Sequence, residues 1–279
     1  MKSSLAQVLV HVDPSPESAL RLQVACKLAA RHGAAMTALY AAMPTYVDVP
    51  FAPGVGAEMA VAMRQVDDTR MAQVRELFAA TQKSAEVRAN WAEIRDDPVM
   101  AVFAQQALYA DLLVLGQHYP AGQNASFVPS DFAQTVMIMS GKPTLMLPGI
   151  GVLSDIGDTI VIAWKPTREA ARAVAAALPF LQAAQAVHVV SWDSGEESVG
   201  GQRLGLSSYL ALHGVRATWH HQGPETADIG ELLLSRAFDL QADLMVMGCY
   251  GHSRAREWVM GGVSRTILGA MTLPVLMSH

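Results

Sequence analysis

The stretch ADLLVLG at residues 110–116 occurs a second time, almost unchanged, as ADLMVMG at residues 242–248. Each copy is a short apolar run that ends in glycine, which is typical of a strand buried on both faces of a parallel sheet. Amphipathic stretches with a helical period separate such runs along the chain. Alternating strands and helices predict an α/β fold with right-handed crossovers and helices on both faces of the sheet.

Three further pairs of segments match in the same order: 13–19 with 165–171, 87–91 with 215–219, and 142–147 with 273–278. Matches that keep their order indicate an internal duplication. Gly and Pro cluster at 148–157, where we place the boundary between the two copies. The sequence therefore predicts two domains, 1–150 and 151–279.

Each copy has five runs that predict strands. They are 7–12, 35–41, 87–94, 112–116 and 144–147 in the first copy, and 159–164, 186–192, 215–221, 244–248 and 274–277 in the second. In the first copy, helical patterns cover 16–31, 57–82, 98–109 and 131–139. Ser15 or Ser18 and Asp131 are candidate N-caps, and Gly33 and Gly141 follow helix ends. The predicted fold is two tandem five-stranded parallel-sheet α/β sandwiches.

Composition excludes several classes of protein. The 279 residues are 51% hydrophobic and 16% charged with net charge −5, which argues against disorder and against binding nucleic acid by phosphate neutralisation. Two distant cysteines, Cys26 and Cys249, form no disulfide framework, so we expect a cytoplasmic protein. Residues 173–192 are uncharged, but Pro179 and several polar residues favour a buried helix and strand over a membrane span.

A glycine-rich loop follows the fourth predicted strand of the second copy, with Gly248, Gly251 and Gly261 in the spacing Gly-x2-Gly-x9-Gly. Glycines let backbone amides approach an anion, and the free N–H groups of a helix N-terminus attract a phosphate. The simpler interpretation is that the glycines only form two turns. Spacing alone leaves both interpretations open.

A strand, this loop, a helix and a short Pro-Val-Leu strand together resemble the universal stress protein family, and the duplication resembles its two-domain members. The resemblance covers essentially the whole chain. It implies an adenine nucleotide alpha hydrolase-like fold, a role in stress response, and binding of ATP, ADP or AMP, with Mg²⁺ accompanying the nucleotide. Some members of the family lack the loop and bind no nucleotide.

The two copies depart from the family pattern in different ways. The first keeps Asp13, which helps position the nucleoside in ATP-binding relatives, but Tyr119 and Pro129 replace two loop glycines. A bulky side chain and a proline without an N–H remove what phosphate binding requires, so we expect no triphosphate there. The second keeps the glycines, but Lys165 stands in the place of Asp13 and Gly262 in the place of a Ser or Thr.

We therefore expect at most one nucleotide site, in the second copy, with base and ribose over its first strand and phosphates at the loop. The expected binding residues are Ala163, Trp164, Lys165, Gly248, Gly251, Gly261, Gly262, Val263 and Ser264. No catalytic residue or metal-ligand set is expected. The alternatives are a protein-interaction module that binds no nucleotide and, third, a slow ATPase.

Two further expectations concern partners. The apolar segment 43–56 is expected to cover the mouth of the first copy or a neighbouring subunit, or to be a well-packed surface loop. The last strand of each copy is an edge candidate for pseudo-symmetric pairing of the two copies or for homodimerisation.

Overall fold

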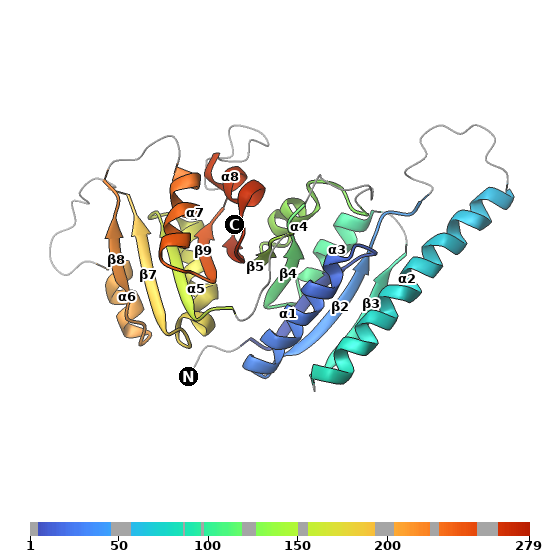
Figure 1. The fold of residues 1–279 in the computed structure, drawn as a ribbon, viewed down its shortest axis with the longest axis horizontal. Helices are drawn as coiled ribbons and strands as arrows, with labels where there is room; N and C mark the ends of the chain where they lie inside the picture. Colours follow the sequence, from blue (N-terminus) through green and yellow to red (C-terminus); the bar gives the residue numbers. More distant parts are fainter. Residues whose placement is uncertain are drawn as a thin grey trace. The chain divides into compact units, whose positions relative to one another are not determined.

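The computed structural model describes residues 5–45, 57–85, 87–95, 98–118, 127–149, 156–192, 204–223, 229–249 and 262–279. Tertiary contacts divide the chain into two compact units, and the division falls between Lys142 and Pro143. Both units are α/β structures built on a sheet with helices on either side (Figure 1).

The first unit has a parallel sheet in the order β3-β2-β1-β4. Its strands are β1 (Gln7–Val12), β2 (Ala35–Ala41), β3 (Ala89–Ile94) and β4 (Leu112–Gly116). The strands β1 and β4 are buried along nearly their whole length, which explains their continuous apolar sequence.

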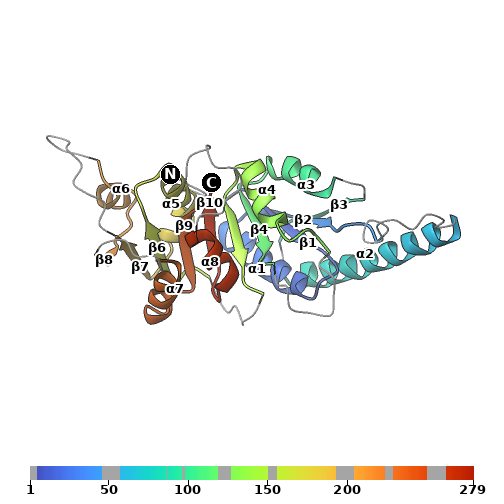
Figure 2. The ribbon, with the colours of Figure 1, turned by 90° about the horizontal axis from the view of Figure 1, so that it is seen from above.

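Helices cover both faces of this sheet (Figure 2). One face carries α1 (Glu17–His32) and α2 (Ala57–Ala85), and the other carries α3 (Val99–Ala107) and α4 (Phe132–Ser140). This arrangement buries the apolar stripe of each helix against the strands.

The ends of these helices were predicted in part. Gly33 and Gly141 cap α1 and α4 in the left-handed conformation, with φ of 65° and 62°, as expected. Asp131 is the N-cap residue of α4, although its side chain makes no capping bond. The expectation for α1 was wrong: Pro16 is its N-cap, while the hydroxyls of Ser15 and Ser18 bond to Asp13 instead.

The second unit has a sheet in the order β5-β10-β9-β6-β7-β8. Its strands are β5 (Thr144–Leu147), β6 (Thr159–Trp164), β7 (Ala186–Ser191), β8 (Thr218–His221), β9 (Leu244–Gly248) and β10 (Val275–Ser278). All neighbours are parallel except β5 and β10, which pair antiparallel. The last strands of the two copies thus pair, as expected, and this pairing is why β5 groups with the second unit.

Four helices flank this second sheet (Figure 2). They are α5 (Arg168–Leu181) and α6 (Leu206–Leu212) on one face, and α7 (Ile229–Asp239) and α8 (Gly262–Ala270) on the other. The uncharged stretch 173–192 contains the end of α5 and all of β7, confirming a buried helix and strand. In the described parts of the chain, none of the helices has both the length and the apolar character that crossing a membrane requires.

Each half of the chain therefore contributes five strands, and the predicted α/β fold class is confirmed. The segment 46–56, which holds most of the apolar 43–56 stretch, lies outside the described residues.

Candidate functional site

The carboxyl ends of β6 and β9 form the place where a ligand is expected in the second unit. The two strands are neighbours, and Ala163 pairs with Met247, so Trp164 and Gly248 end the strands side by side. The chain leaves β6 toward β7 and reaches β9, on the other side of β6, only with its third crossover, so the winding reverses here. Open α/β sheets bind ligands at such switch points.

Gly248 is required by close packing at this edge. A Cβ added to it would lie 2.4 Å from the backbone nitrogen of Ala170 and 2.7 Å from the carbonyl carbon of Glu169. The hydroxyl of Thr167 accepts a hydrogen bond of 3.3 Å from Ala170 N and caps α5. The first turn of α5 thus lies against the end of β9 in backbone contact.

The other expected binding residues fall into three groups. Ala163 and Trp164 end β6 and are half-buried, and Lys165 follows them at the surface. Gly262, Val263 and Ser264 open α8, and Ser264 is buried. Gly251 and Gly261 lie outside the described residues.

Gly262 lies in the first turn of α8, and an added Cβ there would meet none of the described residues within 4 Å. A side chain at this position is therefore compatible with the described part of the fold. Gly262 contrasts in this respect with Gly248.

Two buried titratable groups next to the strand ends were not predicted from the sequence. Glu169 is buried and forms an ion pair with Arg168; burial alone would raise its pKa, but the Arg168 guanidinium outweighs it and lowers the pKa. Burial, reinforced by Glu169, raises the pKa of the Cys249 thiol. Cys249 is therefore a protonated thiol, which is a poor nucleophile.

Metal chemistry gains no support from the described residues. Within them, no group of three His, Cys, Asp or Glu side chains could hold a metal ion. Glu169, the buried carboxylate beside Gly248, is already neutralised by Arg168.

The corresponding edge of the first unit is filled by a polar network. Arg21 on α1 forms a buried ion pair with Asp13, with 2.5 Å between Nη2 and Oδ1. Its side chain also lies over Gly116 at the end of β4, where an added Cβ would be 2.6 Å from Nη1. Ser15 and Ser18 donate their hydroxyls to the same Asp13 carboxylate.

Asp13 is consequently a committed anion. Burial alone would raise its pKa, but the Arg21 guanidinium and the hydrogen bonds from Ser15 and Ser18 hold the pKa well below its usual range. Only 4% of Asp13 is exposed. In this structure the carboxylate of Asp13 is therefore already paired with the Arg21 guanidinium.

The repeat relates this network to the second unit. The matches that pair Asp13 with Lys165 also pair Arg21 with Ala173, a fully buried alanine on α5. Both partners of the ion pair are thus replaced in the second unit, and the atoms nearest to an added Cβ on Gly248 are backbone atoms of α5 and not an arginine side chain. Extending the repeat by two residues past Ala19 would have revealed this difference from the sequence alone.

Comparison with known proteins supports the fold. No protein-family model matches the chain, and no curated protein matches it. Among solved structures, a universal stress protein from Archaeoglobus fulgidus DSM 4304 superposes with a TM-score of 0.69 and 13% identity, covering 97% of this chain and 94% of its own. A putative universal stress protein from Pseudomonas aeruginosa UCBPP-PA14 superposes with a TM-score of 0.56 and 16% identity, covering 98% and 92%.

A third structure, a protein of unknown function from Pseudomonas aeruginosa PAO1, gives a TM-score of 0.58 at 16% identity over 98% of this chain and 92% of its own. All three likenesses extend over nearly the full length of both chains. The chain therefore has the fold of universal stress proteins, and the resemblance stated from its sequence is confirmed at the level of the fold.

Proposed function

We propose that this chain, which has the fold of universal stress proteins, is a two-domain member of that family and a nucleotide-binding module of a stress response. It binds one adenine nucleotide, ATP, ADP or AMP, in its second unit and does not turn it over efficiently. We further propose that it acts in the cytoplasm and associates as a homodimer.

The observation that carries the proposal is the contrast between the two units at the ends of their central strands. In the first, Arg21 covers Gly116 and holds Asp13. In the second, the repeat puts Lys165 and Ala173 at these positions, and the buried carboxylate beside Gly248 is Glu169, which pairs with the largely exposed Arg168. We infer that a phosphate from outside binds at this edge of the second unit, where the repeat has no counterpart of the Asp13–Arg21 pair.

The proposed roles follow from position. Base and ribose lie over the end of β6 at Ala163 and Trp164, while Lys165 supplies positive charge. Phosphates meet the backbone amides of the loop from Gly248 to Gly261 and of the first turn of α8, at Gly262, Val263 and Ser264. Since Glu169 is ion-paired with Arg168, any Mg²⁺ would arrive with the nucleotide and be held by its phosphates.

Gly262→Glu tests the proposal with little risk to the fold. None of the described residues lies within 4 Å of an added Cβ on Gly262. A carboxylate in the first turn of a helix also interacts favourably with the helix dipole. At the same time it repels a phosphate, because two like charges ~5 Å apart near a protein surface cost about 3 kcal/mol. We expect ATP affinity measured by isothermal titration calorimetry to fall at least about tenfold.

Gly262→Gln is the matched control, since it has the same shape without the charge. Its ATP affinity should stay within about threefold of the parent protein, a change of less than ~1 kcal/mol. Equal affinity of the Glu and Gln variants would place the phosphates elsewhere. Absence of ATP, ADP and AMP binding by the parent protein would refute the proposal and favour an interaction module without a nucleotide.

A further inference from the structure

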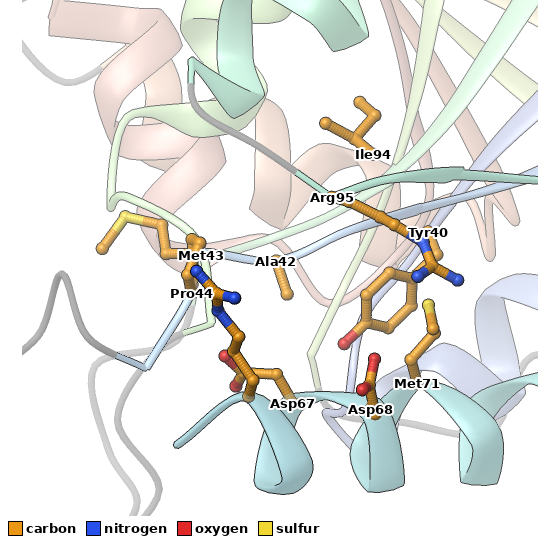
Figure 3. Close-up of a pocket in the computed structure, with 10 residues that line it drawn as sticks. Tyr40, Ala42, Met43, Pro44, Asp67, Asp68, Met71, Ile94 and Arg95 are labelled. Carbon is orange, nitrogen blue, oxygen red and sulfur yellow. The ribbon is translucent and has the colours of Figure 1, made fainter. Parts of the chain in front are cut away.

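A cavity of about 410 Å³ opens in the first unit at the carboxyl ends of β2 and β3. Tyr40 from β2, Met71 from α2 and Ile94 from β3 form part of its wall (Figure 3). Its volume is within the range of small-molecule sites, roughly 300–1,000 Å³. The cavity and the proposed nucleotide site belong to different units, so neither depends on the other.

Tyr40 supplies a hydroxyl to this cavity. The residue is only 6% exposed, yet it lines the cavity together with Asp68 and Met71 (Figure 3). Within the described residues, no hydrogen bond reaches its hydroxyl. The hydroxyl is therefore open to the cavity and can donate to or accept from a molecule that enters it.

Two of the charged residues around the cavity are neutralised within the protein. Asp67 accepts a 3.0 Å hydrogen bond from the backbone nitrogen of Thr45 and forms an ion pair with Arg70. Arg95 donates through Nε to Glu93 at 2.7 Å. These contacts hold both side chains in the cavity wall.

Asp68 and Arg64 differ from them. Both line the cavity from exposed positions on α2, and in the described parts of the chain neither makes a hydrogen bond or an ion pair. A carboxylate and a guanidinium one turn apart on the same helix are thus available at the mouth of the cavity.

Negative charge dominates around the phenol. Burial raises the pKa of Tyr40, and the next largest effects come from the carboxylates of Asp67 and Asp13, which outweigh the guanidinium of Arg70. The phenol therefore stays protonated and keeps an oxygen that can accept a hydrogen bond. A negative field at an accepting oxygen favours a cation over an anion.

We propose that this cavity binds an alkylammonium group, with the ammonium between the Tyr40 hydroxyl and the Asp68 carboxylate. Met71 and Ile94 contact the carbon chain of the ligand. An ammonium donates three hydrogen bonds, and those to a carboxylate are the strongest available to it. Arg64 can form an ion pair only with a ligand that also carries a carboxylate. An amino acid such as ornithine has this group and a diamine does not.

The test is calorimetric titration of the full chain with 1,4-diaminobutane, L-ornithine and the uncharged analogue 1,4-butanediol. We expect both ammonium compounds to bind and the diol not to bind. Tyr40→Phe and Asp68→Asn should each weaken binding by about threefold to tenfold, the size expected for one hydrogen bond or one partly exposed ion pair. Glu76→Gln, the same charge change at an exposed site on α2, is the matched control and should have no effect.

Arg64→Gln distinguishes the two sources of the ammonium. Loss of ornithine affinity alone assigns the cavity to an amino acid, and unchanged affinity for both compounds assigns it to a diamine. Three results would overturn the proposal: no binding of either ammonium compound, equal binding of the diol, or binding that Tyr40→Phe and Asp68→Asn leave unchanged.

Discussion

The buried ion pair between Asp13 and Arg21 determines what the first unit can bind. Both side chains are almost completely buried, and Arg21 also covers the glycine that ends β4. A charge in such a place needs its partner, since removing one member of a buried pair leaves the other uncompensated. The chain has thus placed its own arginine over the carboxyl end of β4 in the first unit.

Arg21→Ala should destabilise the first unit by about 3–5 kcal/mol, because Asp13 would keep its charge without its cation. Asp13→Ala with Arg21→Ala removes both charges and should cost less than the sum of the two single changes. Urea unfolding, resolved to β1 and β4 by hydrogen exchange, measures each loss within the first unit. Additive losses would show that the pair is not coupled.

The sequence pointed to Asp13, Ser15 and Ser18 of this network but not to Arg21. Asp13 was noted through the family resemblance, and Ser15 and Ser18 were expected to cap a helix. Local propensity favours serine as an N-cap, and only the folded chain brings Arg21 of α1 over Asp13 and draws both hydroxyls to the carboxylate. A tertiary contact has overridden a local preference.

Among the helices and strands, the contact between α5 and β9 fixes the proposed nucleotide site. Gly248 allows the backbone of Glu169 and Ala170 to touch the end of β9, so the first turn of α5 cannot withdraw from this edge. This contact holds a helix N-terminus at the place where the winding of the sheet reverses.

Gly248→Ala should therefore destabilise the second unit by about 1–3 kcal/mol, the usual cost of inserting a methyl group into a well-packed contact. The new Cβ would meet backbone atoms, which cannot rotate away as a side chain can. Gly262→Ala, which meets nothing, is the control and should be neutral or slightly stabilising. Thermal unfolding of both variants measures the difference; equal stability would show that α5 is free to shift.

Hydrophobic periodicity predicted the strands well because the sheet of each unit is covered by helices on both faces. The runs expected at 7–12 and 244–248 coincide with β1 and β9 to the residue. The run expected at 215–221 is shorter, since β8 comprises only Thr218–His221 at the edge of its sheet. An edge strand pairs on one side only, so fewer of its residues are held in the ladder.

At the scale of the whole chain, the two units share one fold but differ at the carboxyl ends of their strands, where only the first has the Asp13–Arg21 pair. We propose that 1–150 and 151–279 are the two copies in sequence, whereas the compact units divide between Lys142 and Pro143. The difference comes from β5, which ends the first copy and pairs with β10. The boundary of the sequence repeat and the boundary of the compact units therefore differ by the length of β5, which belongs to the first copy in sequence and to the second unit by its contacts.

The sequence repeat and the glycine spacing predicted which strand ends would form the candidate nucleotide site. The sequence placed it after β6 and β9, and these strands do end side by side. No sequence pattern indicated that Glu169 and Cys249 belong to this edge. What distinguishes them is that both are buried next to Gly248, which only the folded chain shows. The unpaired phenol of Tyr40 was equally hidden, since its cavity is formed by three segments distant in sequence.

Native mass spectrometry of the intact chain with ATP tests most directly whether the two units differ in nucleotide binding. With ATP in excess, and with Gly262→Glu setting the level of adventitious attachment, we predict one bound nucleotide per chain. Two bound nucleotides would mean that Arg21 does not close the first unit. None would mean that the second unit, despite its glycines, binds no nucleotide.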